Sequence, residues 1–151
     1  MKNRLYIAIF LLFVLPAVLS AQTAARIERL LETEAVTYGQ VAQFLLEAAG
    51  VLGYTAAAEA FRYAEERQWL PGDASPSAEA RLDGVALLIM RSFDIRGGIM
   101  YSLFRNARYA YRELVYLDVI HGRISPSMAV SGDLLLFMVG RILSLSEEGQ
   151  L

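Results

Sequence analysis

The chain has 151 residues, 56% of them hydrophobic and 20% charged, and its formal net charge is −2 at pH 7. This apolar fraction excludes a disordered chain, and the slightly negative charge excludes a general nucleic-acid binder, which needs a basic face. The chain has no cysteine, which excludes disulfides, thiol nucleophiles, iron–sulfur clusters and cysteine-ligated zinc. No signature of a catalytic site remains.

Residues 1–21 have the layout of a secretory signal peptide. Lys2 and Arg4 give a cationic start, an apolar run follows from 5 to 16, and small residues lead to Ala21. The alternative is an uncleaved anchor, because the apolar stretch reaches the lower end of the spanning range of roughly 17–25 residues. We expect cleavage, which would export the rest to the periplasm or cell envelope without a membrane span.

The remainder of the chain contains an internal repeat. Residues 75–77 recur as 125–127 with the same sequence, Ser-Pro-Ser, and the ungapped alignment then pairs Asp83 with Asp133. Apolar residues follow in helical rhythm, with Val85, Leu88, Ile89 and Phe93 matching Leu135, Met138, Val139 and Leu143. In a third copy Val36 corresponds to Ala80 and Val130, and its apolar face is Val41, Phe44, Leu45 and Ala48. Such units cannot bury their apolar faces alone, so they are expected to pack together.

Further helical patterns precede these segments, over 26–33, 57–64 and 109–117, and no strand pattern is evident. Pro71 forbids continuation of the second pattern, and Gly122 suits the left-handed residue that ends the third. The sequence therefore predicts an all-α fold of helix–loop–helix units. Its segments are a signal peptide (1–21), a short helix (22–35), a half repeat (36–52), two repeats (55–96 and 105–144) and a frayed tail (145–151).

The starts of the core helices carry capping residues. Thr37 and Gln40 have the spacing of a capping box, in which each side chain hydrogen bonds to the other residue's backbone amide. Ser131 is expected to cap the last helix through its hydroxyl, and Asp83 is expected to cap the middle one. These residues thus have a structural reason to exist without any ligand.

Residues 109–117, Gly122, Pro126 and 130–143, together with the helix opening at 36–41, resemble an S-layer homology (SLH) repeat. The resemblance covers two whole repeats, about 57–93 and 109–143, and the latter half of another, about 36–49. It implies an all-α, pseudo-threefold bundle without enzymatic activity. Modules of this family attach exported proteins to cell-wall polysaccharide or peptidoglycan-associated polymer through a groove between repeats.

The chain departs from the family's hydrophobic-Thr-Arg-Ala-Glu signature. The arginine position holds Tyr38 in the first unit, Leu82 in the second and Gly132 in the third, with Arg81 one place early. The signature acid survives only as Gln40. The resemblance therefore extends further for the fold than for the ligand.

Other polar groups have structural as well as functional interpretations. His121 is the only histidine and is expected at a helix end, so no metal site or cofactor is predicted. Arg105, Arg108 and Arg112 could form a basic stripe for an anionic glycan, or a solvated face. Trp69, in the loop between helices, would be a stacking platform or a core residue. An aromatic tract, which could stack on sugar rings or belong to the core or its rim, consists of Tyr101, Phe104, Tyr109, Tyr111 and Tyr116.

These observations predict a non-catalytic, exported cell-envelope module that binds cell-wall polysaccharide or a peptidoglycan-associated polymer. The expected ligand-binding residues are Tyr38, Arg81, Arg108, Arg112 and Trp69. The alternative is a periplasmic protein–protein adaptor or scaffold subunit on the same fold, in which the glycan signature has eroded.

Overall fold

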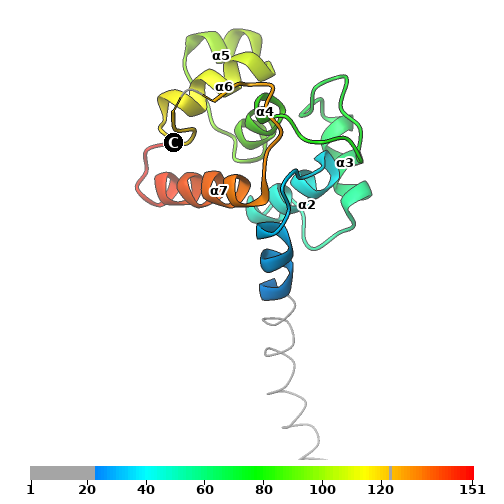
Figure 1. Cartoon of the computed structure of the whole chain (residues 1–151). Helices are drawn as coiled ribbons and strands as arrows, with labels where there is room; N and C mark the ends of the chain where they lie inside the picture. Colours follow the sequence, from blue (N-terminus) through cyan, green and yellow to red (C-terminus); the bar gives the residue numbers. More distant parts are fainter. Residues whose placement is uncertain (1–22, 123) are drawn as a thin grey trace, which may run out of the picture.

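The computed structural model describes residues 23–122 and 124–151, so the expected signal peptide lies outside the described residues. The labelled helices are α2 (Tyr38–Ala48), α3 (Ala57–Glu66), α4 (Leu82–Ser92), α5 (Ile99–Phe104), α6 (Ala107–Tyr116) and α7 (Gly132–Glu147) (Figure 1). Residues 23–31 form a further helix at the base of the body. The described part contains no strand, only isolated bridges, which confirms the all-α prediction. It also contains no helix with the length and apolar character that a membrane span needs.

Three backbone segments close a cycle of hydrogen bonds at the centre of the molecule. The amide of Val36 donates to the carbonyl of Val130 at 2.8 Å, Val130 donates to Ala80 at 2.9 Å, and Ala80 donates back to Val36 at 2.8 Å. All three residues are fully buried. The cycle pairs the peptide groups of segments that lie far apart in the sequence, so these groups are satisfied without a sheet.

The core helices start directly after this cycle. The amide of Tyr38 in α2 donates to the Ala78 carbonyl at 3.0 Å, and the amide of Leu82 in α4 donates to Met128 at 2.9 Å. The amide of Gly132 in α7 donates to Thr33 at 2.9 Å. The first turn of each of these helices is therefore capped partly by the backbone of a distant loop, which satisfies amides that a helix leaves unpaired.

The predicted apolar faces point inward. Val85, Leu88 and Ile89 of α4 are fully buried, and the matching residues of α7, Leu135, Met138 and Val139, are at most 4% exposed. Val41 and Leu45 of α2 are also fully buried. The last position of each pattern differs, because Phe93 is only partly buried and Leu143 is 41% exposed.

The closest helix pairs join expected units rather than forming hairpins within them. Helix α2 packs on α3, and α4 packs on α6, which follows it in the next unit. At the start of α7, Gly132 lies directly against the backbone of Leu30. Each core helix thus has a close neighbour from another part of the chain.

Helix starts only partly follow the predicted caps. The capping box at Thr37 is confirmed, with Gln40 N to Thr37 Oγ1 at 3.3 Å and Thr37 N to Gln40 Oε1 at 2.9 Å. The prediction for Asp83 is wrong, because α4 begins after Arg81 and Asp83 is paired with that guanidinium. Ser131 precedes α7, but its side chain makes no capping hydrogen bond, so the predicted hydroxyl cap is wrong. Its hydroxyl acts on the Asp133 carboxylate instead and lowers the pKa of that group.

Helix ends also differ from expectation at two places. Gly122 is left-handed (φ 79°), as predicted, but it lies beyond the helix end. Helix α6 ends at Tyr116, and Asp118 (φ 57°) takes the left-handed position after it. The Val119 amide then bonds to the Leu114 carbonyl at 2.9 Å and closes the helix end. The predicted tail from 145 is wrong at its start, since α7 continues to Glu147 and Leu145 is only 2% exposed. Burial of that leucine holds the last turn in place.

Candidate binding site

The three positions that correspond to the SLH signature arginine are all packed inside the molecule. Tyr38 is 4% exposed, Leu82 is fully buried, and Gly132 is buried at the start of α7. None of them presents a side chain to solvent. The expected ligand role of Tyr38 therefore has almost no exposed surface to act through.

Tyr38 packs against the first turn of α4. Its hydroxyl accepts the backbone amide of Arg81 at 3.3 Å, and its ring covers Gly84, where an added Cβ would collide with it. Burial raises the pKa of the Tyr38 hydroxyl, and the bond from Arg81 acts in the opposite direction. The tyrosine thus joins α2 to α4 and has a structural role.

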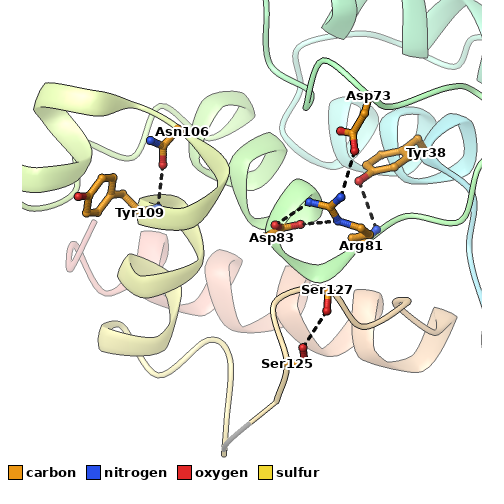
Figure 2. Close-up of polar contacts among 8 residues, drawn as sticks. All are labelled: Tyr38, Asp73, Arg81, Asp83, Asn106, Tyr109, Ser125 and Ser127. Atoms are coloured by element: carbon orange, nitrogen blue, oxygen red, sulfur yellow. Dashed lines mark hydrogen bonds and ion pairs between the residues drawn. The ribbon is translucent and has the colours of Figure 1, made fainter.

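Arg81 is brought next to Tyr38, but its charge is already neutralised (Figure 2). Its guanidinium binds Asp83 through two hydrogen bonds, Nη2–Oδ2 at 2.9 Å and Nε–Oδ1 at 3.2 Å, and binds Asp73 at 3.1 Å. The hydrogen bond to Asp83 is the main cause that raises the pKa of Arg81. With two carboxylates around one guanidinium, this cluster repels an anionic ligand.

Gly132 is required by the close approach of another helix. A Cβ on this residue would overlap the carbonyl group of Leu30, at the end of the helix over 23–31. An arginine is therefore excluded from the third signature position, because the N-terminal helix covers it.

The expected basic stripe of Arg105, Arg108 and Arg112 is broken. Arg105 is not on α6: it ends the short helix α5, which the sequence did not predict, in a left-handed conformation (φ 43°). Arg108 and Arg112 are exposed on α6, and neither has an ion-pair partner within the described ranges. Arg112 borders open hollows beside Tyr116 and Val115.

The residues of the aromatic tract make different kinds of contact. Phe104 and Tyr109 stack with their ring centres 5.2 Å apart, and Asn106 caps α6 through the Tyr109 amide (Figure 2). Tyr111 donates to the Ile124 carbonyl at 2.6 Å and holds the following loop, whereas Tyr116 is 84% exposed. Most of these rings therefore serve the packing of α5 and α6.

Trp69 and Arg105 meet at a polar pocket of about 510 Å³ near the C-terminal end of α4. Its charged lining residues are Arg91, Arg96, Arg105 and Asp94. The lining therefore carries two more positive charges than negative ones, on a chain with a net charge of −2. Trp69 is partly buried, with its ring edge-on to Tyr63 at 6.0 Å between centres. We define this as the arginine pocket.

Sequence reasoning missed most of this pocket. Neither Arg91 nor Arg96 was identified as a site residue, and the deep burial of Tyr101 was not predicted. The signal was Gly97-Gly98: Gly97 has φ +62°, and a Cβ there would collide with the Tyr101 ring. That glycine lets the chain turn back so that Tyr101 and Arg105 reach the end of α4.

His121 is exposed, with Nε2 2.8 Å from the Asp118 carbonyl and its ring edge-on to Phe137. No group of three histidine, cysteine or acidic residues in residues 23–122 and 124–151 is arranged to hold a metal ion. No family model, curated protein or solved structure matches this chain.

Proposed function

We propose that the protein is a non-catalytic module of the cell envelope that binds an anionic wall polysaccharide or a peptidoglycan-associated polymer at the arginine pocket. The observation that carries the proposal is the pocket itself, where Arg91, Arg96 and Arg105 surround a partly exposed face of Trp69. Guanidinium groups bind carboxylate and phosphate through paired hydrogen bonds, and the apolar faces of sugars pack on aromatic rings.

The architecture supports the same proposal. The hydrogen-bond cycle through Val36, Ala80 and Val130 relates three helix starts, each expected from the repeat alignment. We infer an SLH-like, pseudo-threefold bundle in which the helix over 23–31 and α2 form the first unit. The polymer site would then have moved from the signature positions to the arginine pocket. Export rests on the pattern of residues 1–21 alone.

A pull-down with purified wall polymer tests the proposal. The wild-type protein is expected to bind at low salt and to be released at high salt, because the contacts are ionic. The double variant Arg96→Gln/Arg105→Gln should bind at least about tenfold more weakly, since two charge-assisted hydrogen bonds each contribute roughly 1.5–3 kcal/mol.

Two matched variants are the controls. Arg62→Gln removes an exposed arginine of α3 that does not line the pocket, and Arg81→Gln removes the arginine of the neutralised cluster. Both should bind like the wild type. The proposal is wrong if the wild type stays in the supernatant at low salt, or if Arg81→Gln alone abolishes binding.

A second candidate function is the protein–protein adaptor. The observation that favours it is α5, whose Ile99, Met100, Leu103 and Phe104 are 55–78% exposed. Contiguous apolar side chains of this kind are typical of contact surfaces. A stable envelope complex that Leu103→Asp disrupts, with no binding of wall polymer, would replace the first proposal by this one.

A further inference from the structure

Two residues that line the arginine pocket each have a buried hydrogen-bond donor without a partner in the described residues. The donors are the hydroxyl of Tyr101, a residue only 3% exposed, and Nε of Arg91. Buried polar groups in folded proteins are nearly always paired, and an unpaired one destabilises the fold. We therefore expect a molecule that enters the pocket to accept hydrogen bonds from these two donors.

The neighbouring contacts fix both donors in place. Arg91 Nη2 donates to the Arg105 carbonyl at 3.3 Å, which orients the guanidinium. The ring of Tyr101 lies against Gly97 and close to Met90, and any side chain at Gly97 would displace it. These contacts hold the two side chains in place before a ligand arrives, which reduces the entropy lost on binding.

The chemistry of the donors selects an anion. Arginine has no acceptor and keeps its proton, so a partner for Nε must accept. Burial raises the pKa of the Tyr101 hydroxyl, although the charges of Arg91 and Arg105 oppose this shift, so the hydroxyl stays protonated and can donate. Asp94 is exposed in the same lining, and Arg96 and Arg105 add two positive charges.

We propose that the deep part of the arginine pocket binds one oxyanion group, a carboxylate or a phosphate, which accepts hydrogen bonds from the Tyr101 hydroxyl and from Arg91 Nε. Arg105 and Arg96 add ionic attraction, and Trp69 with Met90 supplies an apolar wall for the sugar ring that carries the group. This proposal rests on the proposed function and deepens it, because it names the part of the polymer that is recognised.

The test is calorimetric titration of the purified protein, at constant ionic strength, with inorganic phosphate, with glucuronate and with neutral glucose. Phosphate or glucuronate should bind and glucose should not, and the tighter of the two anions identifies the group on the polymer. Tyr101→Phe removes only the hydroxyl and should weaken anion binding about tenfold, the effect of one lost hydrogen bond to a charged group. Arg91→Lys, which keeps the charge but lacks Nε–H, should weaken it similarly.

Thermal unfolding gives a second readout. In anion-free buffer Tyr101→Phe should unfold at a temperature equal to or above that of the wild type, because it removes an unpaired buried hydroxyl. Added anion should raise the unfolding temperature of the wild type more than that of the variant. Tyr116→Phe, on an 84% exposed side chain, is the matched control and should leave both measurements unchanged.

The outcomes separate this proposal from the proposed function. If neither anion binds the wild type more tightly than it binds Tyr101→Phe and Arg91→Lys, the oxyanion proposal is overturned, even where wall polymer is still retained. If the anions bind as expected and the polymer does not, the oxyanion site stands and the polymer proposal fails.

Discussion

The hydroxyl of Tyr38 accepts the backbone amide of Arg81 at 3.3 Å and thereby joins the start of α2 to the start of α4. Both residues were predicted to bind a ligand, and the structure brings them into contact. Their contact, however, is a structural one: the tyrosine is buried, and the arginine side chain is held by Asp73 and Asp83.

Replacing Tyr38 by phenylalanine tests this role. The variant keeps the ring over Gly84 but leaves the Arg81 amide without its partner, so we expect a loss of about 1–2 kcal/mol in the free energy of unfolding. Chemical denaturation measures it. Tyr116→Phe should change nothing, and equal stability of Tyr38→Phe and wild type would contradict the structural role.

Replacing two glycines of α7 by alanine should change the stability of the protein in opposite directions. Gly132→Ala places a methyl group on the Leu30 carbonyl, and forcing the N-terminal helix away should cost at least about 1–3 kcal/mol. Gly140→Ala has open space around it and should stabilise the helix by about 0.5–1 kcal/mol. Unfolding curves of both variants are the measurement. A Gly132→Ala protein as stable as the wild type would show that the two helices do not touch.

The extension of α7 can be tested with a pair of leucines. Leu145→Ala removes a side chain that is 2% exposed and should cost about 2–5 kcal/mol. Leu143→Ala, on a side chain 41% exposed, should cost about 1 kcal/mol or less. If the two losses are equal, the chain from 145 onward is frayed, as the sequence first indicated.

The carboxyl of Asp133 should make stability depend on pH. The hydrogen bond from Ser131 is the main cause that lowers the Asp133 pKa below its ordinary value of 3.8. A lowered pKa in the folded state adds stability above the ordinary value, and this stability is lost as the pH falls through the lowered pKa.

Ser131→Ala should therefore raise the Asp133 pKa, measured by NMR titration of the carboxyl carbon. The variant should be less stable than the wild type at pH 6, and this difference should shrink as the pH falls through the lowered Asp133 pKa. Ser146→Ala, an exposed serine of the same helix, is the control. An unchanged Asp133 pKa in Ser131→Ala would exclude the hydrogen bond.

The sequence by itself determined the helices and their buried faces. The periodicity that placed Val85, Leu88 and Ile89 on one face, the capping box at Thr37, and the equivalence of Val36, Ala80 and Val130 are all local or repeated patterns. Such patterns are visible because burial of one helix face requires apolar residues at fixed spacing. The same reasoning found five of the six labelled helices from the repeat and its preceding segments, and failed at α5, which has only six residues and an exposed apolar surface.

Only the tertiary structure decided where a ligand can bind. The charge of Arg81 is neutralised by two carboxylates, one of them eight residues earlier, and Gly132 is covered by the helix over 23–31. Conversely, Trp69, Arg91 and Arg105 come from separate segments and share one pocket. Charge pairing and burial depend on how segments meet in space, which spacing along the chain does not encode, so a site assembled from three segments appears only once they are folded together.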